Sequence, residues 1–152
     1  MRLGILGELE SQLGSAVKPE TDLQPFAMTW AQVAEMAAGG IDFGSHATSH
    51  QVLTMLTDDA LAYELRESRR RIQAETGQPV DVIAYPVGSA DAYDERVIAC
   101  ARESGYKLGV SYRPGVNRMS HLEHFALTRL RVERYISRNQ FQSLLCLPGV
   151  LE

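Results

Sequence analysis

Apolar residues recur along this chain with two different periods, and the change of period marks the predicted elements. Helical spacing is clearest in residues 57–76, where Leu61, Leu65, Ser68 and Ile72 form one stripe. Weaker helical patterns lie in residues 3–13, 29–38, 93–104 and 139–146. Short apolar runs bounded by glycine or proline predict strands at 41–44, 80–85, 106–112 and 127–132.

Capping residues indicate where two of these helices begin. Thr29 and Gln32 fit a capping box, with a hydroxyl at the N-cap and an amide side chain at the third helical position. Thr57 precedes two aspartates, whose negative charge favours the first turn of a helix. Gly77 is suited to end that helix, because glycine adopts the left-handed conformation of a C-terminal cap.

The alternation of helices and strands predicts a single α/β domain over residues 1–152 with a mostly parallel sheet. In such folds the chemistry lies at the carboxyl ends of the strands. The motif Ser45-His46 and the motif Tyr85-Pro86-Val87-Gly88 both follow predicted strands directly. We therefore expect both motifs at the same edge of the sheet.

Composition excludes several classes of protein. A chain of 152 residues that is 45% hydrophobic and 22% charged is typical of one globular domain. The net charge of -4 and the lack of a basic block argue against nucleic-acid binding. No apolar run is long enough to span a membrane, and the N-terminus lacks the apolar region of a signal peptide, which favours a cytoplasmic location by default. Cys100 and Cys146 lack metal-type spacing, and a disulfide between them stays open.

The stretch GSHATSH carries the strongest candidate chemistry. His46 and His50 are four residues apart, so both can lie on one face of a helical turn and share a metal ion. Neutral imidazole suits zinc and related divalent metals. Two histidines make only half of a site, however. The spacing alone favours two exposed histidines beside a turn capped by Ser45 or Ser49.

The order of the motifs resembles that of the polysaccharide deacetylases, the NodB-homology group also called carbohydrate esterase family four. GGIDFGSHATSH resembles the second motif of that family, and VDVIAYPVGSADAYDERV resembles the third. RPGVNRMSHLEHFALTRLRVER resembles the C-terminal part. The resemblance covers about residues 28–147. It implies a distorted (β/α) barrel with fewer than eight strands that removes acetyl groups from N-acetylated or O-acetylated sugars.

The resemblance also implies roles for individual residues. His46 and His50 would be ligands of a divalent metal, with zinc the first choice. Tyr85 would offer its backbone N–H to the developing oxyanion. Pro86 and Gly88 would shape that loop and contact substrate, and Arg113 is a weaker candidate for substrate binding.

Two expected parts of the family pattern have no match. The motif Thr-Phe-Asp-Asp, which supplies the base and the third metal ligand, is absent before His46, and Asp42 is predicted to point away from that histidine. We therefore expect a partial barrel that lacks its first strand, with a divergent helix and loop at residues 1–28. The late strand LTRLRVE has no catalytic histidine, although His121 and His124 lie nearby in sequence.

Two functions remain open from sequence. One is a metal-dependent hydrolase that deacetylates N-acetylated polysaccharide or oligosaccharide, impaired by the missing aspartates; the other is a non-catalytic remnant or carbohydrate-binding domain of the same fold. A phosphate-binding domain is less favoured, since neither glycine-rich phosphate motif occurs. A missing strand would leave an open sheet edge, for which residues 3–13 or a second copy of the chain, in a homo-oligomer, are candidate covers.

Overall fold

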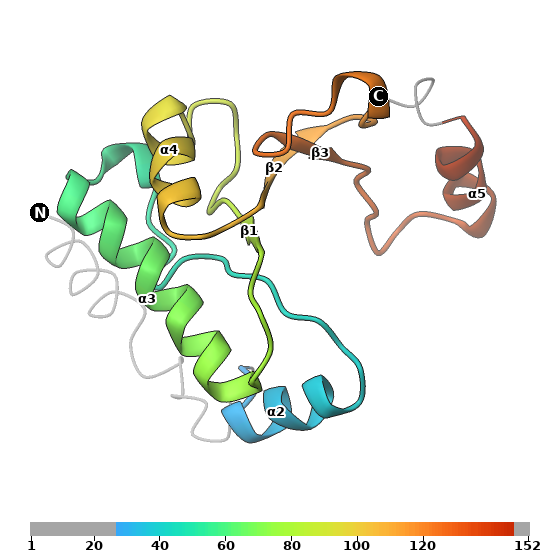
Figure 1. Cartoon of the computed structure of the whole chain (residues 1–152). Coiled ribbons are helices and arrows are strands. Elements are labelled where there is room, and N and C mark those ends of the chain that lie inside the picture. The colour runs from blue at the N-terminus through green and yellow to red at the C-terminus, as the bar shows by residue number, and fades with distance from the viewer. Residues whose placement is uncertain (1–26, 148–152) are drawn as a thin grey trace, which may run out of the picture.

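The computed structural model describes residues 27–147 and shows helices packed against a small parallel sheet (Figure 1). The elements, in chain order, are α2 (Trp30–Ala38), η2 (Leu53–Met55), α3 (Asp58–Thr76), β1 (Val82–Ala84), α4 (Glu95–Glu103), β2 (Leu108–Pro114), η3 (Met119–His121), β3 (Leu127–Arg129) and α5 (Arg138–Cys146). The helix predicted at residues 3–13 lies outside the described residues.

The predicted caps are confirmed at both ends of α3 and at the start of α2. Both hydrogen bonds of the capping box between Thr29 and Gln32 are present. The Thr57 hydroxyl accepts from the Ala60 N–H, and Gly77 ends α3 with a φ of 69°. Helix α4 begins two residues later than predicted, because Asp94 takes the N-cap position.

The sheet has the predicted parallel topology, with the order β1-β2-β3. The strand predicted at residues 41–44 is wrong: this stretch is reduced to one parallel bridge between Ser45 and Ile83. The Ser45 N–H donates to the Val82 carbonyl at 2.8 Å, and the Ala84 N–H donates to the Ser45 carbonyl at 2.9 Å. Ser45 is buried whereas Ile41 is 48% exposed, so only the end of this stretch is held by the sheet.

The core lies between the sheet and helices α3 and α4. Its buried members include Leu61 and Leu65 of α3, Val97 and Ala101 of α4, and Ile83 of β1. Each large apolar side chain buried in this way contributes about 2 kcal/mol to the free energy of unfolding. This packing supports one face of the sheet and fixes the carboxyl ends of its strands.

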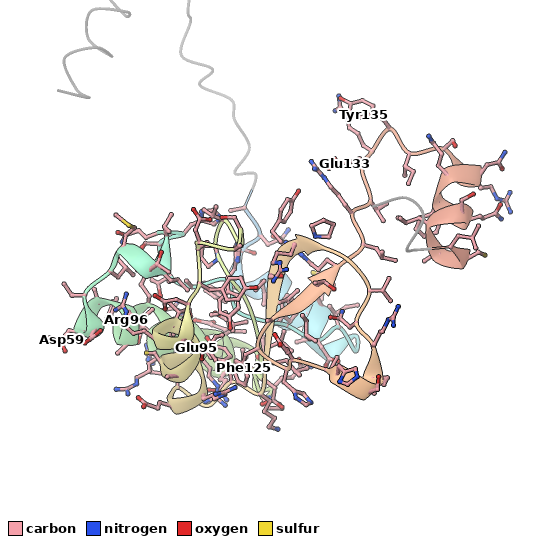
Figure 2. The ribbon with its side chains drawn as sticks, turned by 90° about the horizontal axis from the view of Figure 1, so that it is seen from above. Asp59, Glu95, Arg96, Phe125, Glu133 and Tyr135 are labelled. Atoms are coloured by element: carbon pink, nitrogen blue, oxygen red, sulfur yellow. The ribbon has the colours of Figure 1, made fainter. Side chains whose placement is uncertain are left out.

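After β3 the chain leaves this body and forms α5, which lies apart from the sheet (Figures 1 and 2). Ser137 and Gln140 form the capping box that begins α5. None of the helices within residues 27–147 is both long and apolar enough to cross a bilayer. Cys100 and Cys146 are both free thiols, so the disulfide left open by the sequence is not formed.

The α/β class with a parallel sheet is thus confirmed. Between residues 27 and 147 the sheet has three strands in a linear order, and the described part of the chain places no strand on the far side of Ser45. Closure of the sheet into a barrel stays a prediction, as does cover of this edge by another segment or a second copy.

Candidate functional site

His46 follows the Ser45 bridge and is oriented by the neighbouring strand. Its Nδ1 lies 2.6 Å from the carbonyl oxygen of Ala84, the last residue of β1. Because a carbonyl only accepts, Nδ1 carries the proton in this contact, and the lone pair of Nε2 is left free. Histidines that bind metals have this arrangement: one ring nitrogen donates to a fixed acceptor and the other faces the ion.

The ring of His50 lies beside that of His46. The two ring centroids are 4.8 Å apart and the ring planes are inclined by 75°. Residues 46–50 do not form the helical turn that the four-residue spacing allows, because Ala47 and His50 have φ values of 63° and 58°. Left-handed residues reverse the chain within this loop, and the reversal rather than helical periodicity brings the two imidazoles together.

A buried carboxylate holds this loop, here called the histidine loop (residues 45–50), against α3. Glu64 is only 5% exposed. One of its oxygens accepts the N–H groups of Thr48 and Ser49 at 2.7 and 2.8 Å, and the other accepts the Ser49 hydroxyl at 2.5 Å. Burial acts to raise the pKa of Glu64, but these three hydrogen bonds outweigh it and hold that pKa below its usual value. Glu64 is therefore an ionised anchor of the loop.

Buried hydroxyl groups form a second anchor beneath the same loop. The hydroxyls of Ser45 and Ser68 are 2.8 Å apart, and the Tyr106 hydroxyl lies 3.3 Å from that of Ser68. Tyr106 also donates to the Leu65 carbonyl at 2.9 Å. The network satisfies polar groups that would otherwise be costly to bury. The network connects Ser45, at the start of the histidine loop, to α3 and to Tyr106, which lies two residues before β2.

The donor set fits one half of a zinc site. Two imidazoles with free nitrogens are suitable ligands, and four ligands are usual for this metal. Within the described residues, no third His, Cys, Asp or Glu joins His46 and His50 in a group able to hold a metal. Glu64 is committed to the loop, and Asp42 is exposed and outside any such group. Metal binding by the pair stays a prediction.

The structure corrects the prediction for Tyr85. Its N–H donates to the Val110 carbonyl at 3.0 Å and so belongs to the sheet. Its side chain is buried, is stacked on Tyr93 with centroids 4.6 Å apart, and donates to the Phe125 carbonyl at 3.0 Å. Burial raises the pKa of Tyr85 far above its usual value. Tyr85 is a core residue, and its N–H is not available to an oxyanion.

The tight turn after Tyr85 presents a different backbone donor. The Gly88 N–H donates to the Pro86 carbonyl at 2.7 Å, across Val87, which has a φ of 64°. Such a γ-turn is rare and strained, most of all for a β-branched residue. Within residues 27–147, no protein acceptor receives the Val87 N–H. The first N–H beyond the sheet is therefore that of Val87, a residue that is 51% exposed.

The remaining predicted residues divide between the two edges of the sheet. Pro86 is fully buried and shapes the turn, and Arg113 is exposed near the carboxyl end of β2, on the same edge as His46. His124 instead precedes β3, where its carbonyl accepts the Gly109 N–H at 2.8 Å. That position is the amino edge of the sheet, so His124 does not join the histidine pair. His121 is an exposed residue of η3.

Comparison with known proteins identifies the family. The polysaccharide deacetylase family model matches residues 13–109. YxkH of Bacillus subtilis (strain 168), a protein assigned to the polysaccharide deacetylases, is 32% identical over 114 residues, which are 75% of this chain and 39% of YxkH. This chain thus spans well under half of that relative.

Solved structures agree with this assignment. The deacetylase PplD of Streptococcus pyogenes, solved in complex with acetate, is 25% identical with a TM-score of 0.69, over 87% of this chain and 53% of PplD. BC0361, a polysaccharide deacetylase from Bacillus cereus, is 26% identical with a TM-score of 0.69, over 80% of this chain and 37% of BC0361. The matched family model covers more than half of the sequence, including the histidine loop and the turn after Tyr85. This chain belongs to the polysaccharide deacetylase family.

Proposed function

We propose that this chain acts as a zinc-dependent deacetylase on N-acetylated polysaccharide, with its activity limited by an incomplete ligand set. The observation that carries the proposal is the pairing of His46 and His50, with the His46 Nδ1 held at 2.6 Å by the Ala84 carbonyl. This contact leaves Nε2 without a proton, which supports a role for that nitrogen as a metal ligand. Acetate, the acid released by deacetylation, is the molecule bound in the related PplD structure.

Four residues of this chain would have distinct roles in the reaction. His46 and His50 hold the ion through neutral imidazole nitrogens. Zinc held there would act as a Lewis acid, and it would polarise the acyl carbonyl and lower the pKa of water. The Val87 N–H takes the oxyanion role predicted for Tyr85, because it is the first backbone donor beyond the sheet. Arg113 contacts the glycan at the same edge.

The alternative is a non-catalytic domain of the same fold that only binds carbohydrate. It is favoured by one observation: among the described residues, no carboxylate groups with the two histidines to serve as third ligand or base. A site with two ligands and no base is expected to bind zinc weakly and to turn over slowly. The two functions differ in acetate release, not in glycan binding.

The test is a zinc-binding isotherm of the full chain at neutral pH, beside His46→Ala and His50→Ala. Each substitution should weaken zinc binding by about tenfold or more, since each removes one of two protein ligands. His121→Ala is the matched control, because His121 is an exposed histidine away from the pair. Binding that neither loop substitution weakens would contradict the proposed metal site.

Acetate release from an N-acetylglucosamine oligomer, measured with zinc present, then separates the two functions. Slow release that is abolished by His46→Ala and retained by His121→Ala supports the deacetylase. Zinc binding without any acetate release supports the non-catalytic domain instead.

A further inference from the structure

Positive charge is concentrated in one segment of this acidic chain. Residues 112–138 contain six arginines and only two glutamates, whereas the whole chain has a net charge of -4. The segment runs from the end of β2 through β3 to the start of α5. Arg113 and Arg129 of this segment lie at the carboxyl ends of β2 and β3, on the edge of the sheet that also carries the histidine loop.

A groove opens within this segment. It has a volume of about 590 Å³ and is lined by Tyr112 and Pro114 of β2, by Arg129 at the end of β3, and by residues 130–133. Glu133 lies on the arm that leads from β3 toward α5, as Figure 2 shows. The lining is a mixture of apolar surface and guanidinium groups, which is suited to a ligand with both a ring and a charge.

The two arginines of the groove are in different electrostatic states. Both guanidinium groups lie over the Tyr112 ring, Arg129 at 4.8 Å and Arg131 at 5.7 Å from its centroid. Arg131 is neutralised by Glu133, whose carboxylate is 2.5 Å from its Nε. Within residues 27–147, Arg129 has no carboxylate within salt-bridge distance. Stacking on Tyr112 orients its guanidinium plane and leaves the N–H edges free for an anion.

A backbone hydrogen bond links the groove to the edge of the sheet that carries the histidine loop. The Tyr112 N–H donates to the Gly88 carbonyl at 2.7 Å, so Tyr112 adjoins the turn that presents the Val87 N–H. Counted across the sheet, β3 is three strand spacings from the stretch that ends at Ser45, or about 14 Å. A polysaccharide whose acetyl group lies at the histidine loop would reach the groove with a neighbouring sugar.

We propose that Arg129, oriented by Tyr112, binds a carboxylate or phosphate group on the polysaccharide, so that this chain prefers an anionic N-acetylated glycan. A planar guanidinium binds either group with two parallel hydrogen bonds, which a neutral sugar does not offer. The inference rests on the proposed function for one point, namely that the ligand is a saccharide.

The test measures the affinity of the full chain, without zinc, for three oligosaccharides of equal length. The first is neutral N-acetylglucosamine oligomer, the second alternates N-acetylglucosamine with glucuronate, and the third is the neutral oligomer carrying phosphate on its sugars. At least one charged oligomer should bind about tenfold more tightly than the neutral one, and the two charged arms distinguish carboxylate from phosphate. The ratio of the two affinities should become smaller as the salt concentration is raised from about 50 to about 500 mM, because salt screens the attraction between the guanidinium and the anionic group.

Two groove variants and one matched control locate the preference. Arg129→Gln should abolish it, and Tyr112→Ala should reduce it because the guanidinium loses its orientation. Arg134→Gln is the control, since Arg134 is also stacked on a tyrosine, with 4.5 Å to the Tyr135 centroid, but lies outside the groove. Equal affinity for neutral and charged oligomers, no saccharide binding at all, or an equal loss in Arg134→Gln would overturn the inference.

Failure of this inference is distinguishable from failure of the proposed function. His46→Ala should leave the preference for charged oligomers intact, because the measurement needs neither zinc nor turnover. A chain that binds charged glycan through Arg129 but no zinc would overturn the proposed metal site alone.

Discussion

Replacement of Glu64 by glutamine tests whether a buried carboxylate holds the histidine loop in place. The carboxylate accepts three hydrogen bonds from the loop, at 2.7, 2.8 and 2.5 Å, from a residue only 5% exposed. Glutamine has nearly the same shape but carries no charge. One of its two terminal atoms still accepts, and the other becomes a donor.

The loss of stability expected for Glu64→Gln depends on the hydrogen bonds that glutamine can still form. Its carbonyl oxygen can accept the two N–H groups of Thr48 and Ser49, while its NH₂ group faces the Ser49 hydroxyl, which can accept. Hydrogen bonds to a charged group contribute about 1.5–3 kcal/mol each, against about 1 kcal/mol for neutral ones. Loss of the charge on three bonds, partly offset by the lower desolvation cost of the amide, gives an expected loss of about 2 kcal/mol in the free energy of unfolding.

The assay is urea unfolding, followed by the fluorescence of the single tryptophan, Trp30. The hydrogen bonds lower the pKa of Glu64 in the folded chain, whereas in the unfolded chain it is about 4.3. The stabilisation is therefore complete above pH 4.3 or so and is lost as the pH falls through the lowered folded pKa. The difference in the free energy of unfolding between wild type and Glu64→Gln should be largest at pH 7 and should become smaller as the pH is lowered.

Glu67→Gln is the matched control, one turn along the same helix. Glu67 forms an ion pair with Arg70 at 2.6 Å on the surface, and the Arg70 side chain is 63% exposed. Exposed pairs of this kind contribute little, so Glu67→Gln should change the free energy of unfolding much less than Glu64→Gln does. The reasoning would be refuted by wild-type stability of Glu64→Gln at pH 7, by a gap that widens in acid, or by an equal loss in Glu67→Gln.

The remaining predictions concern the backbone and core beside the site. Gly88→Ala should cost about 3 kcal/mol in urea unfolding, because its Cβ would lie 2.7 Å from the Tyr112 nitrogen at a φ of 65°. Gly77→Ala, at a φ of 69° with no atom within 4 Å, should cost only about 1 kcal/mol by the same measurement; an equal cost at both positions would contradict the role of close approach. Tyr85→Phe should lose about 1.5 kcal/mol, because the Phe125 carbonyl loses its buried donor, and unchanged unfolding would refute this.

The sequence predicts the helices and the parallel order well because their signals are local. Thr29, Thr57 and Gly77 act on backbone groups within four residues, so their effect survives in any tertiary context. Strand lengths are less predictable, because a strand extends only as far as its neighbour pairs with it. The stretch that ends at Ser45 shows this: its apolar residues resemble a strand, but one bridge is all that pairing with β1 provides.

The site is predictable in its residue types but not in its geometry. The resemblance of GGIDFGSHATSH to the family's second motif identifies His46 and His50, while the left-handed residues that bring their rings together leave no recognisable sequence signal. Glu64 is not among the residues predicted from the sequence, although a signal for it exists. It lies between Leu61 and Leu65 on the stripe of α3 that faces the core, and a carboxylate on a buried stripe needs a partner. Its partners are backbone N–H groups, which no pattern of side chains reveals.

The hydrogen bonds of the histidine loop to Glu64 are of the size needed to offset the cost of the loop's backbone conformation. Two non-glycine residues with positive φ, Ala47 and His50, cost about 1–2 kcal/mol each. Hydrogen bonds from the loop to the Glu64 carboxylate offset a cost of that size without a contribution from zinc. Under the proposed function, a zinc ion would bind two imidazoles that lie side by side, one of them oriented by the Ala84 carbonyl. Under the same proposal, the incomplete ligand set would limit the affinity for zinc, whereas the ordering of these two ligands would not.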